Sequence, residues 1–175
     1  MKRLVVLMIA MTMTYLLPGF ASAAGVTMVR GGGTGTFGAD LDGDGDVDAS
    51  SFGMGVRILT NGTASGHFLC LMAGRSDILG LPLMSVRGSV THGSLNADGS
   101  VTFSGVATVN LGSGSDQIFR GLSFQVTAFA GGPGVGKMQL TVMGAFDGVP
   151  GDTVLGNGNY DLPSEAVNSG QIAFG

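Results

Sequence analysis

Five aspartates at alternate positions are the residues of this sequence whose type and spacing indicate the most specific chemistry. They lie within one short stretch: Asp40, Asp42, Asp44, Asp46 and Asp48. Calcium takes about six to eight oxygen ligands, and alternate residues of a tight loop can direct their carboxylates towards one point. The stretch, called here the acidic loop (residues 40–48), therefore predicts a calcium site made by these five side chains.

With Asp40 as position 1, the acidic loop resembles the calcium loop of EF-hands and dockerins. The resemblance implies that Gly45 at position 6 permits a sharp turn and that Val47 at position 8 makes a small apolar contact. Ser51 at position 12 departs from the family, which has a bidentate acid there, so we expect weak binding. A second loop with its helix is missing from the sequence, and a dockerin function is therefore not expected.

The alternative for the acidic loop is a solvated turn between two strands that binds no metal. Mutual repulsion among five carboxylates within nine residues favours a cation. Even if calcium binds, we expect a structural role and not a catalytic one. Extracellular calcium modules bind with dissociation constants of about 10⁻⁴–10⁻³ M. At that affinity, millimolar calcium adds only about 1–2 kcal/mol to the free energy of unfolding.

Two glycine motifs imitate nucleotide-binding loops but lack residues that such loops need. Residues 131–138 nearly spell GxxxxGK[ST], yet Met138 stands where a hydroxyl must hold magnesium, and strand-like alternation follows in place of a helix. Gly33, Gly35 and Gly38 form GxGxxG, but the acidic loop follows where a helix should begin. Both motifs are therefore interpreted as glycine-rich turns.

Histidine and cysteine are too few for a four-ligand zinc site without carboxylates. His67 and Cys70 are three residues apart, which places them on opposite faces of a regular strand. Cys70 is the only cysteine, so an intramolecular disulfide is excluded and a buried apolar role is expected. His92 is expected near the end of a hairpin.

The acids outside the acidic loop lie mostly beside residues that favour turns. They are Asp77, Asp98, Asp116, Asp147, Asp152, Asp161 and Glu165. A pair of them meeting in a cleft would be needed for glycoside hydrolysis. No serine lies in a GxSxG motif, so we name no catalytic residue.

The first 23 residues predict a cleaved secretory signal peptide that begins as a helix. Lys2 and Arg3 precede the apolar run Leu4–Leu17, and Ala21-Ser22-Ala23 supplies small residues for cleavage. The mature protein is therefore expected to be secreted, either periplasmic or extracellular, where millimolar calcium is plausible. No later apolar stretch reaches the roughly 18 residues of a membrane helix, so no transmembrane segment is expected after cleavage.

The charge of the chain bears on its partners. Its net charge is −4, and the signal segment carries two of the eight basic residues and none of the twelve acidic ones. Lys137 is the only lysine after that segment, so a nucleic-acid partner is not expected. We expect an extracellular or cell-envelope partner instead.

Alternation of apolar and polar residues predicts the strands that must position these groups. It is clearest over Val101–Asn110, and it recurs in Leu122–Ala130 and Met138–Val142. The turn-forming residues Asn96–Ser100 join Met84–Leu95 to the first of these as a hairpin. Weaker candidates are Val26–Arg30, Thr34–Ala39, Phe52–Leu59, Ala64–Ala73 and Gly170–Phe174.

The fold class follows from these short strands and from 33 glycines without a collagen period. We expect residues 24–175 to form one all-β domain of about eight to ten strands. Its architecture is an antiparallel β-barrel-like meander or a β-sandwich, since both share the same alternation.

Four stretches together resemble a group of small secreted bacterial glycine-rich β domains of unassigned activity. They are Ala64–Gly74, Val101–Asn110, Gly131–Val142 and Gly156–Ile172. The resemblance implies an exported β domain that ends in a closing strand, with the acidic loop inserted between two early strands. It implies no catalytic residues.

We therefore expect a secreted non-enzymatic β module with a structural or binding role, stabilised by calcium at the acidic loop. One alternative is a calycin-like barrel that binds a small apolar ligand in a wide interior lined by Met, Phe and Leu. The other is an extracellular carbohydrate-active hydrolase, which requires two carboxylates about 5–10 Å apart in a cleft.

Overall fold

The computed structural model describes residues 25–38, 40, 45, 47–73, 83–112, 117–149 and 151–175. The predicted signal peptide (1–23) lies outside the described residues, as do Asp42, Asp44 and Asp46 of the acidic loop. Within the described ranges, no helix has both the length and the apolar character needed to cross a membrane.

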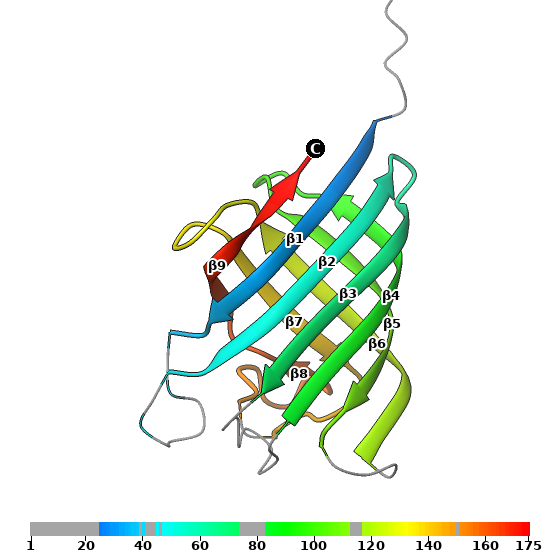
Figure 1. The fold of residues 1–175 in the computed structure, drawn as a ribbon. Helices are drawn as coiled ribbons and strands as arrows, with labels where there is room; N and C mark the ends of the chain where they lie inside the picture. Colours follow the sequence, from blue (N-terminus) through cyan, green and yellow to red (C-terminus); the bar gives the residue numbers. More distant parts are fainter. Residues whose placement is uncertain are drawn as a thin grey trace, which may run out of the picture.

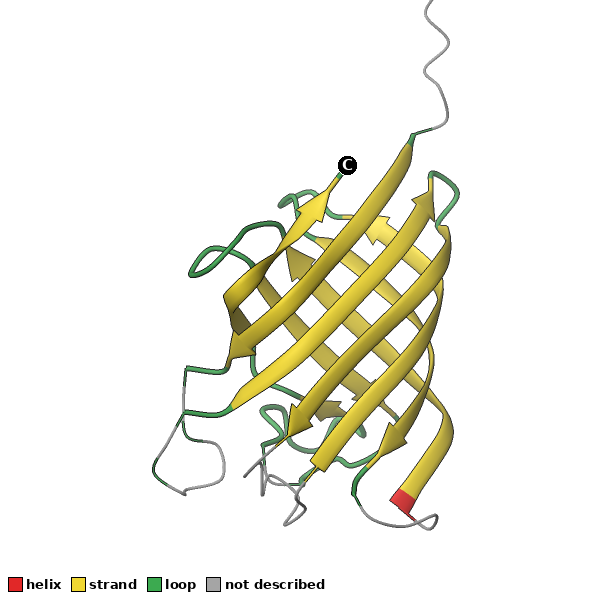
Figure 2. Ribbon diagram, viewed as in Figure 1, coloured by secondary structure: helices red, strands yellow, loops and turns green. Residues whose placement is uncertain are grey.

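The described residues contain nine β-strands, whose arrangement Figures 1 and 2 show. They are β1 (Val26–Thr36), β2 (Ala49–Leu59), β3 (Thr63–Ala73), β4 (Leu83–Leu95), β5 (Val101–Asn110), β6 (Ile118–Phe129), β7 (Lys137–Met143), β8 (Tyr160–Asp161) and β9 (Glu165–Phe174). The prediction of a single all-β domain with about eight to ten strands is confirmed in fold class and strand number.

The strands form one antiparallel sheet that closes into a ring (Figure 1). From β1 to β7 each strand pairs with the next one along the chain. Strand β9 closes the ring because it pairs with β1 on one side and with the start of β7 on the other. The end of β7 pairs instead with the short β8. The structure is therefore a single closed sheet, not two sheets packed face to face.

Alternation in the sequence determines which side chains fill the inside of the ring. In β2 every second residue from Ser50 to Ile58 is buried, and in β5 the same holds for Val101, Phe103, Ala107 and Val109. Because successive side chains of a strand point to opposite faces, the apolar set of each strand faces the interior. Burial of these side chains stabilises the fold through the hydrophobic effect.

An aromatic cluster fills the middle of the ring. The ring centroid of Phe68 lies 5.8 Å from that of Phe124 in a stacked pair and 5.9 Å from that of Phe103 in an edge-on pair. Gly88 makes room for this cluster, since a Cβ at that position would overlap the ring of Phe124. Phe103, Phe124 and Val126 are 0% exposed, so no water-sized space adjoins them. The described interior is a filled core here.

The main differences between the predicted and the observed strands lie in β1, β8 and β9. The separate candidates 26–30 and 34–39 form one strand, β1, because Gly31–Gly33 pair with β2 on one side and with β9 on the other. The last strand begins at Glu165 and not at Gly170. Strand β8 was not predicted, since its two residues are too few to show alternation.

Candidate functional site

The acidic loop joins β1 to β2 at one end of the ring, which we call the acidic-loop end (Figure 1). Thr36 and Ala49 are paired at the base of the loop, and the Phe37 amide donates a hydrogen bond to the Asp48 carbonyl at 3.0 Å. The loop therefore has a fixed base formed by two neighbouring strands.

Asp40 and Gly45 show how the described part of the loop turns. The Gly45 amide donates a hydrogen bond to Oδ2 of Asp40 at 2.9 Å, and Gly45 has a φ of 97°. Glycine adopts this left-handed region without the strain of a side chain, so the predicted turn at Gly45 is present. Val47, expected to make an apolar contact, is instead 54% exposed.

The structure does not bring the five predicted calcium ligands together as one described group. Asp40 is exposed, Asp48 is buried, and the other three acids lie outside the described residues. Among described residues, no three His, Cys, Asp or Glu side chains lie close enough to hold a metal ion. The calcium site therefore stays a prediction.

Asp48 lies beside Tyr160 of β8 inside the acidic-loop end. Asp48 is 8% exposed and Tyr160 is fully buried. Burial raises the pKa of Tyr160, and the negative charges of Asp152 and Asp48 raise it further. This environment keeps the phenol of Tyr160 protonated.

A second buried polar group lies at the same end of the ring. The Ser50 hydroxyl of β2 donates a hydrogen bond to Oε2 of Glu165 at 2.6 Å, and it also lies beside the thiol of Cys70. Glu165, at the start of β9, is only 3% exposed. Gly35 leaves the space for its carboxyl group, since a Cβ there would lie 2.7 Å from Oε2.

The electrostatics of this group favour neutral side chains. Burial raises the pKa of Glu165 to about 7, and the hydrogen bond from Ser50 opposes that rise. Burial, and then the charge of Glu165, raise the pKa of Cys70 far above its ordinary value. A protonated thiol that is 2% exposed is a poor nucleophile. The predicted burial of Cys70 is confirmed.

Two aspartates between residues 144 and 161 accept hydrogen bonds from backbone amides of the same segment. Asp147 accepts hydrogen bonds from Gly156 and Gly158, and Asp152 accepts one from Gly148 at 2.9 Å. The hydrogen bond from Gly148 is the main reason why the pKa of Asp152 is lowered. These acids stabilise turns, as their neighbours in the sequence predict.

Asp98 has the same role in the β4–β5 hairpin. Its Oδ1 accepts hydrogen bonds from the Ser100 hydroxyl at 2.6 Å and from the Ser100 amide at 2.9 Å. These bonds lower the pKa of Asp98, the hydroxyl having the larger effect. The predicted hairpin and its turn are confirmed.

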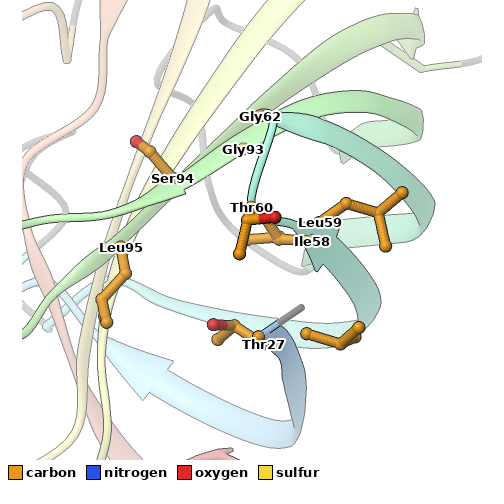
Figure 3. Close-up of a pocket in the computed structure, with 10 residues that line it drawn as sticks. Thr27, Ile58, Leu59, Thr60, Gly62, Gly93, Ser94 and Leu95 are labelled. Atoms are coloured by element: carbon orange, nitrogen blue, oxygen red, sulfur yellow. The ribbon is translucent and has the colours of Figure 1, made fainter. Parts of the chain in front are cut away.

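A pocket of about 370 Å³ opens at the opposite end of the ring (Figure 3). We call it the mouth pocket. It is lined by Gly25, Val26, Thr27, Ile58, Leu59, Thr60, Gly62, Gly93, Ser94 and Leu95. Ile58 is buried at the base, whereas Leu95 is 60% exposed at the rim. The pocket therefore offers apolar contact area between the beginning of β1 and the end of β4.

The remaining predicted candidates lie apart from one another. His67 is exposed and Cys70 is buried on the other face of β3, as their spacing predicts. Lys137 begins strand β7, so the phosphate-loop-like motif leads into a strand and not a helix. His92 is exposed, and its Nδ1 is hydrogen-bonded to the hydroxyl of the neighbouring Thr91 at 2.9 Å.

Sequence reasoning missed the buried pair of Ser50 and Glu165. Glu165 was grouped with the turn acids because Pro163 and Ser164 precede it. A signal was nevertheless present, since Glu165 and Val167 alternate in phase at the start of a strand, and Glu165 is the only glutamate. The partner, Ser50, is 115 residues away and gives no local signal.

Comparisons with family models, with curated proteins and with solved structures find no match to this chain. Its function is therefore inferred from its own residues and their geometry.

Proposed function

We propose that this chain is a secreted, non-enzymatic β module with a structural or binding role, and that calcium orders its acidic loop. The observation that carries this proposal is the loop geometry, in which the Gly45 amide closes a turn on Asp40 above a base held by β1 and β2. The turn lies within the stretch of sequence that carries all five aspartates between positions 40 and 48.

The chemistry of the loop fits calcium. Its ionic side chains are all carboxylates, and calcium prefers oxygen ligands. A cation would relieve the repulsion among the acids and would tie the loop more firmly to the ends of β1 and β2. Its effect would be stability and a fixed loop surface for a partner, without a chemical step.

Thermal unfolding of residues 24–175 tests the calcium site. We expect the melting temperature to be lower in excess EDTA and to rise by roughly 2–8 °C in about 5 mM calcium. In the double variant Asp42→Asn plus Asp44→Asn the rise should disappear. The variant Asp98→Asn removes a carboxylate elsewhere, and its calcium-dependent rise should stay intact.

Identical melts of the wild-type chain in EDTA and in calcium would contradict the site and leave the acidic loop as a solvated turn. A rise that persists in the double variant would place the cation elsewhere in the molecule. Magnesium at the same concentration controls for ionic strength.

Binding of a small apolar molecule is a second candidate, favoured by the mouth pocket. The filled core does not support the wide interior that a calycin-like barrel requires, but a volume of about 370 Å³ at the rim falls in the range of small-molecule sites. Titration with an apolar fluorescent dye tests it. We expect Leu95→Asp to abolish dye binding and Leu155→Asp, at another exposed leucine, to preserve it. Equal binding by both variants would contradict a specific site.

A further inference from the structure

Two arginines flank one threonine on the outer face of the ring. Arg87 of β4 pairs in register with Thr108 of β5, and Thr108 pairs with Arg120 of β6. Neighbouring strands are about 4.8 Å apart, so the two arginine backbones are separated by roughly 10 Å. Two long side chains at this spacing can reach the same group above Thr108.

The space between these arginines is a polar groove of about 370 Å³, which we call the arginine groove. Its lining residues are Ser85, Arg87, Thr108, Asn110, Ile118 and Arg120. None of them is acidic. Within the part of the chain that the structure describes, neither guanidinium has a carboxylate partner. The groove therefore combines two positive charges with hydroxyl and amide donors.

The groove is positively charged although the chain as a whole has a net charge of −4. The reason is that the described acids lie elsewhere. The described carboxylates serve other groups: Asp98 caps the β4–β5 turn, and Asp147 and Asp152 hold the 144–161 segment. Glu165 is buried inside the ring. None of these described carboxylates neutralises the positive charge of the groove, so Arg87 and Arg120 can attract an anion to this part of the sheet.

We propose that the arginine groove binds a sulfate or carboxylate oxyanion, either as a free ion or as a group carried on an acidic polysaccharide. Planar guanidinium groups match such oxyanions with paired, charge-assisted hydrogen bonds. Arg87 and Arg120 hold the oxyanion from two sides, and the Thr108 hydroxyl and the Asn110 amide donate from below. This inference goes beyond the proposed function and uses no residue of the acidic loop or of the mouth pocket.

Amide NMR titration of the mature chain tests the groove with two probes at constant ionic strength: inorganic sulfate and a sulfated oligosaccharide. We expect saturable shifts centred on Arg87, Thr108 and Arg120. Loss of a charged hydrogen-bond donor should weaken binding at least about tenfold in Arg87→Gln and in Arg120→Gln. Arg57→Gln, at an exposed arginine on β2 outside the groove, is the matched control and should bind as the wild type does.

The two probes separate the sources of the oxyanion. Saturation by inorganic sulfate and by the oligosaccharide supports a pocket for the ionic group itself. Saturation by the oligosaccharide alone, lost in Arg87→Gln, supports recognition of the group on its polymer. Shifts that fail to saturate with both probes, or that weaken equally in Arg57→Gln, would overturn the proposal. Calcium dependence of the melting temperature is a separate readout, so its failure leaves this test unaffected.

Discussion

Glu165 is the residue whose environment departs most from its sequence context. Its carboxyl group lies inside the acidic-loop end of the ring, with the Ser50 hydroxyl as a hydrogen-bond donor and Cys70 nearby. Burial disfavours the charged form of a carboxyl group. The folded protein therefore holds a proton on Glu165 that the unfolded chain would release at the same pH.

This proton makes stability depend on pH. The pKa of Glu165 rises from 4.5 to about 7 on folding. Between these values the folded state binds more protons, so the free energy of unfolding falls as pH rises, by on the order of 3 kcal/mol in total. We expect the proton on Glu165 to make its full contribution to the free energy of unfolding below pH 4.5, and that contribution to be lost above about pH 7. Urea unfolding across this range measures it.

Glu165→Gln is the variant that isolates this effect, because a neutral amide still accepts the hydrogen bond from Ser50. Its stability should lack the decline between pH 4.5 and 7 that we expect of the wild type. Asp98 and Asp152 have lowered pKa values, so their titration lies below this window. Parallel pH profiles of the two proteins would contradict the assignment to Glu165.

At the scale of residues, the sequence predicts sites that depend on local spacing. The turn at Gly45, the burial of Cys70 and the outward direction of His67 each follow from neighbours a few positions away. The Ser50–Glu165 pair and the arginine groove depend instead on which strands are adjacent. That information lies in long-range pairing, which no local pattern contains.

At the scale of elements, strands with polar residues at alternate positions are well predicted. Val101–Asn110 has the same bounds in the sequence analysis and in the structure. The sequence analysis gives strand β1 as two candidates, one on each side of Gly31–Gly33. In the structure, hydrogen bonding to strands on both sides compensates for the low strand propensity of these glycines.

Gly88 shows that a strand glycine can be required by packing between elements. The missing side chain on β4 leaves space for the ring of Phe124 from β6. We expect Gly88→Ala to overpack the aromatic cluster and to lower the free energy of unfolding by about 1–3 kcal/mol. Chemical denaturation, with near-ultraviolet circular dichroism of the phenylalanine cluster, measures the change.

Gly55→Ala is the matched control, because a Cβ at Gly55 on β2 meets nothing within 4 Å. Stability should be unchanged there or raised by about 0.4–1 kcal/mol, since alanine restricts the unfolded chain. Equal losses in both variants would indicate that backbone propensity, and not the contact with Phe124, determines the role of Gly88.

At the scale of the whole molecule, the alternation of residues predicts a sheet with one apolar face but not how that sheet closes. A sandwich and a closed ring bury the same alternate positions. The distinction depends on β9, whose Phe174 pairs with Val29 of β1 across almost the whole chain. The filled core follows from the large side chains on the inner face, and the sequence identified several of them.

The pairing of β1 with β9 has a mechanical consequence. Met28 and Gly175 exchange backbone hydrogen bonds of 2.6 and 2.9 Å, so the outer ends of these two antiparallel strands lie side by side. Tension applied at Met28 and Gly175 breaks the hydrogen bonds between β1 and β9 one after another, starting at this end. Tension that pulls the two strands along their length in opposite directions would load all of these hydrogen bonds together. We therefore expect tension applied at Met28 and Gly175 to separate β1 from β9 before any other pair of strands, and at a lower force than tension that shears the two strands past each other.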